Sequence, residues 1–355
     1  MSNLRSLWLR LLVTSIPIVF IGCIDQFAVD LPANGEFIVI NGLITNEAGP
    51  YMVSVSKSIS LNSSNGVSNA QVSISDGIGQ VLSFFERSPG VYESDSISAF
   101  QGRVGSVYQL NVITADGDEY KSEPEVMVRV PEIRGMSFVA RSKVDVTQAG
   151  NEVARVGIEA LLSTSIVGDG GTFLRWDYRG VFLLHRPNAC VVCPQQCWVP
   201  DDQPRDNLLI FGSQVQEEGI PINDISITFL TPDFKLDSPY VVWVKQFSLN
   251  RSAYDFWQAV DNQRTGTGTI FDATPNVIYG NMVSISNPNE QVLGYFGASA
   301  VDQKMLNISR DELPQVIFDE VLFLECNSRD EVANYCTDCT LFPNSRTTFP
   351  NDIWQ

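Results

Sequence analysis

Residues 51–59 read YMVSVSKSI, and this stretch decides the class of the fold. The apolar residues Tyr51, Val53, Val55 and Ile59 alternate with serines and other polar residues. Successive side chains of an extended backbone point to opposite faces, so this alternation predicts a β-strand with one buried face and one polar face. The stretch therefore favours a β-rich fold.

Shorter apolar runs of the same kind follow this strand, and turn signals such as Asp76-Gly77 separate them. The runs lie at 72–74, 81–85 and 108–112. Short strands separated by turns about every ten residues are typical of an antiparallel β-sandwich. We therefore predict a β-sandwich domain over 36–131, preceded by a polar tether at 23–35.

A second β-rich domain is predicted over 132–355. One of its strands has apolar residues on one face and charged residues on the other, namely Arg175, Asp177 and Arg179. Opposite charges on a sheet can pair across its surface, so we favour a solvated face over a ligand site. A nearly continuous apolar run predicts a central strand at 240–249, and further strands are expected at 277–285 and 292–299.

One helix is predicted, because Ala253, Phe256, Trp257 and Val260 recur at helical spacing behind a candidate N-cap at Ser252. We interpret the aromatic residues of this helix as core packing rather than as a binding face. The fold expected from all these elements is mainly β. It has two antiparallel β-sandwich domains, the second with a short helix, cysteine-rich loops braced by disulfides and a C-terminal tail.

The first residues have the pattern of an export signal. Arg5 and Arg10 lead into a short apolar run that ends at Gly22-Cys23. The run is too short to cross a bilayer, and a cysteine directly after a small residue is typical of the acylation site of bacterial lipoproteins. We therefore predict a lipoprotein signal peptide over 1–22 and a lipid anchor at Cys23.

Seven cysteines are present, and six remain once Cys23 is assigned to the lipid. An even number of cysteines in an exported chain predicts a disulfide framework. The candidates are Cys190, Cys193, Cys197, Cys326, Cys336 and Cys339. A zinc site built from thiolates and His185 is the alternative. Export favours oxidised cysteines, so we expect three disulfides and no metal.

The composition and the motif search limit the possible functions. The net charge is −18, which argues against a nucleic-acid partner because phosphate binding needs basic patches. His185 is the only histidine, and the chain has neither a Gly-x-Ser-x-Gly elbow nor a phosphate-binding loop. A pair of carboxylates of the glycosidase type remains open, but no spacing selects one. We therefore expect a protein that is not an enzyme and that uses no cofactor.

A series of short motifs runs through the second half of the chain. It comprises Cys197-Trp198, Phe256-Trp257, 268–275, 278–282, 292–296, 335–340 and 349–354. Through these motifs the chain resembles the Bacteroidota outer-membrane lipoproteins grouped as domain-of-unknown-function family forty-two forty-nine. The predicted first domain is similar to the immunoglobulin-like carboxypeptidase-regulatory module in the stretches 41–44, 90–92 and 108–110.

The resemblance implies a setting and a partner. Members of that family look like cell-surface lipoproteins that accompany TonB-dependent transporters. We therefore expect a lipid-anchored protein of the outer membrane, facing the cell exterior, which helps a transporter barrel to capture or gate an unidentified nutrient. A structural or adhesive envelope lipoprotein is the alternative, and a secreted hydrolase is the third possibility.

The residues expected to contact such a barrel are exposed aromatic and arginine side chains. Our candidates are Arg175, Arg179, Phe349 and Trp354, with core packing as the rival interpretation of the two aromatic residues. Asp95-Ser96-Ile97 resembles an O-glycosylation acceptor of exported Bacteroidota proteins. For Ser96 we favour an ordinary loop over a modification site.

Overall fold

The computed structural model describes residues 37–60, 63–95, 100–146, 151–168, 170–185, 194–201, 208–265, 277–319, 321 and 338–354. Over these residues the chain is mainly β, as the sequence predicts. The predicted signal peptide, the tether, Cys23 and Ser96 lie outside the described residues. None of the helices in the described ranges is both long and apolar enough to span a bilayer.

Twelve strands form the first sheet. Nine come from the predicted first domain: β1 (Phe37–Thr45), β2 (Met52–Ser60), β3 (Ser63–Gly66), β4 (Gln71–Asp76), β5 (Val81–Ser88), β6 (Val91–Ser94), β7 (Val107–Ile113), β8 (Glu119–Ser122) and β9 (Glu125–Val126). Three come from much later in the chain: β17 (Met282–Ser284), β18 (Val292–Leu293) and β19 (Phe296–Ser299). The main path runs β17-β8-β7-β4-β5-β6-β2-β1-β18. Its pairs are antiparallel, except that β1 pairs in parallel with β18 and with β19.

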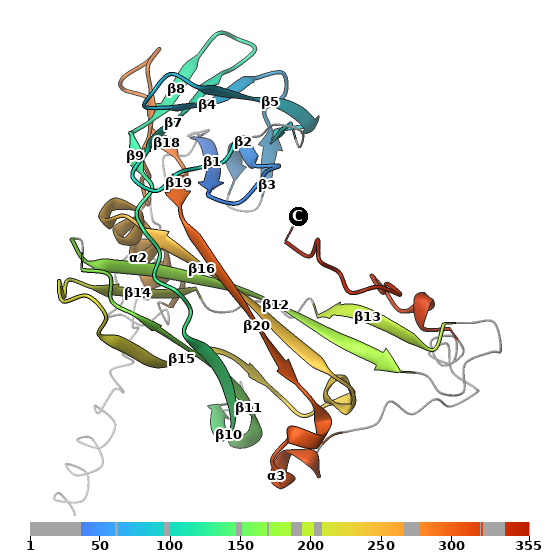
Figure 1. The fold of residues 1–355 in the computed structure, drawn as a ribbon. Coiled ribbons are helices and arrows are strands. Elements are labelled where there is room, and N and C mark those ends of the chain that lie inside the picture. Colours follow the sequence, from blue (N-terminus) through green and yellow to red (C-terminus); the bar gives the residue numbers. More distant parts are fainter. Residues whose placement is uncertain are drawn as a thin grey trace, which may run out of the picture. The chain divides into compact units, whose positions relative to one another are not determined.

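The segment 282–299 thus returns to the first sheet and supplies the strands at both ends of its main path (Figure 1). β17 pairs with β8 at one end, and β18 and β19 pair with β1 at the other. Unpaired strand edges invite aggregation, so these short strands protect the sheet. The sequence predicts a first domain that ends at 131, whereas this sheet is completed by later strands that were assigned to the second domain.

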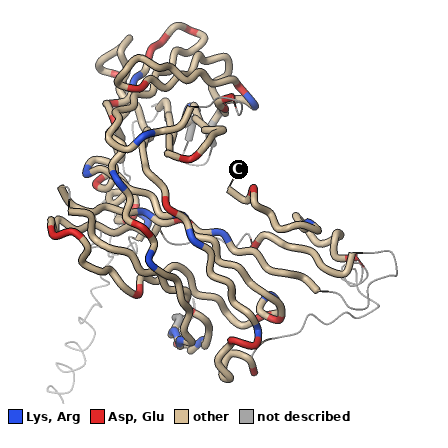
Figure 2. Tube along the Cα trace, in the orientation of Figure 1, with Lys and Arg blue, Asp and Glu red and all other residues tan. Residues whose placement is uncertain are grey.

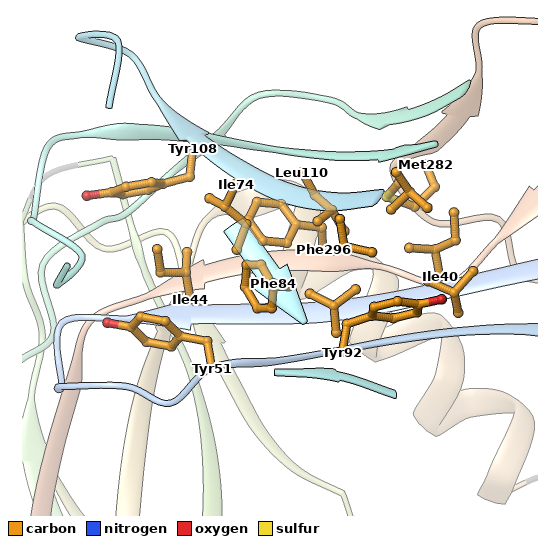
Figure 3. Packing of buried hydrophobic residues seen from close by; sticks show 14 of the residues in the cluster. Ile40, Ile44, Tyr51, Ile74, Phe84, Tyr92, Tyr108, Leu110, Met282 and Phe296 are labelled. Atoms are coloured by element: carbon orange, nitrogen blue, oxygen red, sulfur yellow. The ribbon is translucent and has the colours of Figure 1, made fainter. Parts of the chain in front are cut away.

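The core of the first sheet is shared between its early and late strands. Ile40, Ile74 and Leu110 come from β1, β4 and β7, and all three are fully buried. Met282 and Phe296 from the returning segment lie among the same side chains (Figure 3). The alternating apolar positions that predict the early strands therefore face one core, which the later strands help to fill.

The other strands form two sheets that share a second core. The three-stranded sheet has the order β10 (Gly135–Val146), β11 (Glu152–Ser165), β15 (Pro221–Leu230). The five-stranded sheet has the order β13 (Gln196–Asp201), β12 (Thr172–His185), β16 (Tyr240–Leu249), β20 (Val301–Ile308), with β14 (Leu209–Ser213) also beside β12. The central strand predicted at 240–249 is β16, and nine of its ten residues are buried.

Helix α2 (Arg251–Thr265) lies where the sequence predicts a helix, but its N-cap is different. The side chain of Asn250 accepts the backbone N–H of Ala253 at 2.8 Å, whereas the predicted cap Ser252 lies inside the helix. An asparagine side chain satisfies a free N–H at a helix start as well as a serine does. Short helical turns complete the described elements: η1 (Phe234–Asp237), η2 (Arg310–Glu312), α3 (Gln315–Phe318) and η3 (Cys339–Leu341).

Candidate interaction surface

One face of the five-stranded sheet carries cations and aromatic rings, and we call it the cation–aromatic face (Arg175, Arg179, Trp243, Lys245 and Phe247). The register of β12 and β16 sets Arg179 opposite Trp243, Asp177 opposite Lys245 and Arg175 opposite Phe247. Alternate residues of β12 point away from this face and enter the second core. The alternation of the strand therefore gathers its charged residues on one side.

Arg175 contacts two rings at one end of this face. Its guanidinium carbon is 4.7 Å from the ring centroid of Phe247 and 4.9 Å from that of Trp257 on helix α2. Both distances lie within the range at which a guanidinium is attracted to an aromatic ring. The neighbouring helix residue Phe256 stacks on Tyr295, with centroids 4.7 Å apart. One of the two helix aromatics therefore covers a cation of the sheet.

A second contact lies further along β12, where Trp354 of the C-terminal tail meets two cations. The ring centroid of Trp354 is 5.4 Å from the guanidinium carbon of Arg179 and 5.2 Å from Nζ of Lys245. Lys245 also forms an ion pair with Glu47 at 2.6 Å. Among the described residues Arg179 has no carboxylate partner, and its buried Nε atom has no hydrogen bond. Two cations therefore share one ring, and Arg179 lacks a counter-ion within the described ranges.

Aromatic contacts continue along the tail. Phe349 packs edge-on against Trp198 of β13 with centroids 5.1 Å apart, and it lies 6.2 Å from Trp243. Trp354 meets Trp243 edge-on at 6.2 Å. Trp243 donates its indole N–H to Gln303 of β20, so the central ring is held from the sheet. Such aromatic pairs contribute about 0.5–1.5 kcal/mol each beyond the area that they bury.

The tail is joined to the sheet by a covalent bond and by backbone hydrogen bonds. Cys339 forms a disulfide with Cys197 of β13, and their Cα atoms are 5.7 Å apart. Further along the tail, Arg346 exchanges two backbone hydrogen bonds of 2.7 and 2.8 Å with Trp198. The tail therefore runs beside β13 (Figure 1). The other four candidate cysteines lie outside the described residues, so the expectation of three disulfides stays a prediction. They are Cys190, Cys193, Cys326 and Cys336.

The structure brings three of the four candidate contact residues together, namely Arg179, Phe349 and Trp354. The fourth, Arg175, lies on the same face beside other rings. The expectation of a solvated face is wrong, because the helix and the tail place aromatic rings on its cations. Both covering segments are distant from β12 in the sequence, so its alternation could not reveal them.

Three further members of the face, Trp243, Lys245 and Phe247, are not predicted from the sequence. All three lie in the apolar run at 240–249, which predicts only a central strand. Strand register sets Trp243 opposite Arg179 and Phe247 opposite Arg175, and register is a property of pairing that a single strand does not encode. The signal available in the sequence is a lysine inside a run rich in aliphatic and aromatic residues.

The metal alternative is weakened by the disulfide. Cys197 and Cys339 are joined to each other, so they do not offer zinc the thiolates that it binds. Within the described ranges, no three His, Cys, Asp or Glu side chains converge as a metal site would require. Basic residues of the described chain lie in several small groups rather than in one broad patch (Figure 2).

The sequence profile of one family, described as Domain of unknown function (DUF4249), matches residues 24–305. This chain belongs to the DUF4249 family. The predicted resemblance is thereby confirmed at the level of the family. The match includes the strands of the cation–aromatic face and ends before the tail that covers it. No curated protein matches this DUF4249 chain.

A buried carboxylate forms the centre of a second polar cluster in this DUF4249 chain, which no local sequence pattern predicts. Glu125 of β9 is 2% exposed and accepts hydrogen bonds from Tyr295 at 2.7 Å and from Asn281 at 2.9 Å. Asn250 and Ser252 at the start of α2 donate to the same carboxylate. All four donors are neutral, and burial raises the pKa of Glu125. Because the cluster ties β9 to α2 and to the returning segment, we interpret it as a structural joint.

Proposed function

We propose that this DUF4249 protein is an accessory subunit of a TonB-dependent outer-membrane transporter, and that the cation–aromatic face with its tail is the contact surface. The observation that carries the proposal is the gathering of arginine and tryptophan side chains on one face of the five-stranded sheet. Trp and Arg are the residues that most often dominate binding energy at protein interfaces. The family resemblance supplies the kind of partner.

The proposal includes the setting that the resemblance implies. It assigns the chain to the Bacteroidota, an immunoglobulin-like character to the N-terminal module, and acylation to Cys23. A lipid anchor would hold the protein on the same membrane as the barrel. Such tethering raises the effective concentration of the two partners, so a modest intrinsic affinity is sufficient.

Site-specific crosslinking in intact cells tests the proposal. Met305 of β20 is 41% exposed and lies opposite Trp243 in the sheet, so a photo-crosslinking residue there samples the face without replacing a contact residue. Phe85 of β5 is 65% exposed on the first sheet and is the matched control position. We expect the probe at Met305 to recover an outer-membrane barrel and the probe at Phe85 to recover much less of it.

The anchor gives a second arm to the same experiment. Cys23→Ser should abolish incorporation of a fatty-acid analogue and should reduce the crosslink from Met305. Recovery of only further copies of this chain would favour the adhesive alternative. Recovery of no barrel, together with release of product from a glycan or a peptide, would overturn the proposal in favour of a hydrolase.

A further inference from the structure

The geometry points to residues 346–354 of the tail as an internal occupant of the cation–aromatic face, which a partner peptide with an aromatic residue beside a carboxylate displaces. This inference deepens the proposed function, because it concerns the regulation and the partner chemistry of the same surface.

The attachments of the tail are unequal along its length. Its start is fixed by the disulfide between Cys339 and Cys197. Beyond that point the contacts with the sheet are non-covalent: the backbone pairing of Arg346 with Trp198 and the ring contacts of Phe349 and Trp354. The distal part can therefore leave the face while the covalent anchor keeps it close by. A tethered occupant of this kind rebinds readily and blocks weak competitors.

The fit between tail and face is incomplete at Trp354. The indole Nε1 atom of Trp354 and the Nε atom of Arg179 are both buried, and neither has a hydrogen-bond partner in the part of the chain that the structure describes. Leaving such groups unpaired is unfavourable, so a ligand that satisfies one of them gains over the tail. The carboxylate of Asp352 in the tail is engaged elsewhere, because it pairs with Arg346 within the tail itself.

Among the described residues no carboxylate pairs with Arg179, Asp177 of the same face included. The group that would satisfy Arg179 is therefore an anion. A carboxylate is matched in shape to a guanidinium and can accept two of its N–H groups at once. Lys245, the other cation beside Trp354, already has Glu47 as its counter-ion. A ligand that keeps an indole between these cations and adds a carboxylate next to it would satisfy the face better than the tail does.

The backbone contact indicates that the ligand is a peptide whose first part pairs with β13. Arg346 takes up two backbone hydrogen bonds at Trp198, and β13 ends the main path of its sheet. An edge strand of this kind offers hydrogen-bonding groups to any extended segment, whatever its sequence. This pairing applies to the start of the incoming segment, because the ring-bearing end of the tail is turned: the backbone N–H of Ile353 donates to the carbonyl of Pro350.

A free peptide with the sequence of residues 345–355 is a suitable probe, added to the full mature chain and followed by fluorescence anisotropy. We compare wild type with the double variant Phe349→Ala, Trp354→Ala, in which the resident rings are gone. The apparent affinity of an occupied site is reduced by the fraction of time that it is free, so the double variant should bind the peptide at least about tenfold more tightly. A peptide with both aromatics replaced by alanine is the control and should not bind.

A second set of peptides tests whether a carboxylate beside the tryptophan strengthens binding. A peptide carrying Ile353→Glu places an acidic group beside the tryptophan and should bind the double variant about threefold or more tightly than the tail sequence does. Arg179→Gln in the double variant should remove that gain. If the double variant does not fold, Trp354→Ala alone takes its place with the same expected direction.

Equal peptide binding by wild type and by the tail variant, or no binding by either, would overturn the inference. A gain from Ile353→Glu that survives Arg179→Gln would overturn the assignment of the carboxylate to Arg179. No transporter is present in this assay, so its failure leaves the crosslinking experiment standing. Conversely, peptide exchange without a crosslinked barrel would refute the proposed partner and keep the displaceable tail.

Discussion

At the scale of the residue, Glu125 is a carboxylate buried among neutral donors, held by Tyr295, Asn281, Asn250 and Ser252. Burial raises its pKa, so the folded chain keeps this proton to a higher pH than the unfolded chain does. The folded state then binds more protons than the unfolded state. The free energy of unfolding must therefore fall as the pH rises from the unfolded pKa of about 4.3 through the folded pKa.

We predict that Glu125→Gln removes this part of the pH dependence. The free energy of unfolding of wild type should decrease relative to that of the variant from about pH 4 upward through the folded pKa, because glutamine does not titrate. Urea unfolding at a series of pH values measures the difference. Glu152→Gln, at an exposed position of β11, is the control for removing one acidic charge. Parallel profiles for wild type and Glu125→Gln would show that the prediction is wrong.

The residues of this chain differ in how far their roles could be predicted. Arg179, Phe349 and Trp354 could be named as contact candidates from side-chain chemistry alone, and the structure brings them together. Glu125 could not be found, because its four partners lie between 125 and 170 positions away in the chain. A local pattern carries no information about such partners.

At the scale of the element, the turn between β18 and β19 sets their parallel pairing with β1. Gly294 in this turn has a φ of +94°, and a Cβ atom there would lie 2.1 Å from the carbonyl oxygen of Ile40. Both the backbone conformation and the close approach require glycine. The backbone N–H of Gly42 donates to the carbonyl of Tyr295 at 3.2 Å, which joins the turn to β1.

We predict that Gly294→Ala is much more destabilising than Gly117→Ala. Gly117 has nearly the same φ, +92°, but a Cβ atom there meets nothing within 4 Å. Gly117→Ala should therefore cost only the backbone strain, about 1–2 kcal/mol. Gly294→Ala should cost about 1–3 kcal/mol more, because the strands must move apart. Urea unfolding of both variants measures the two costs, and equal values would rule out close packing as the reason for glycine at 294.

Elements could be predicted where one periodic run decides them, and less well at their ends and in their pairing. The strand at 51–59 and helix α2 follow from alternation and from helical spacing. The helix cap was misplaced because Ser252 and Asn250 are both acceptable cap residues, and the tertiary contact of Asn250 with Glu125 is invisible in the sequence. The sequence predicts strands at 277–285 and 292–299, but it does not predict that they pair with the first sheet.

At the scale of the whole molecule, the first sheet is completed by residues that lie far along the chain. Alternation specifies that a strand has a buried face, but it does not specify which core the face enters. The returning segment was therefore assigned to the second domain by its position in the sequence. Its buried residues Met282, Val292 and Phe296 instead belong to the first core.

We predict that a fragment of residues 36–131 does not fold by itself. Each of the three missing apolar side chains contributes about 1.5–3 kcal/mol when fully buried, which together is a large share of a net stability of about 5–15 kcal/mol. The fragment also leaves β1 and β8 without the strands that cover them. Circular dichroism during urea titration should show no cooperative transition, and the fragment should associate at concentrations where the full chain does not.

A peptide of residues 277–301, supplied in trans, should restore what the fragment lacks. It carries β17, β18 and β19, so it can cover both ends of the main path and return Met282, Val292 and Phe296 to the core. We expect a cooperative urea transition to appear only when the peptide is present, with a midpoint that rises with peptide concentration. The same peptide with Gly294→Ala should be much weaker. A fragment that unfolds cooperatively without any peptide would show that the early strands form a sufficient core, and that the later strands are an addition to the sheet and not a requirement for it.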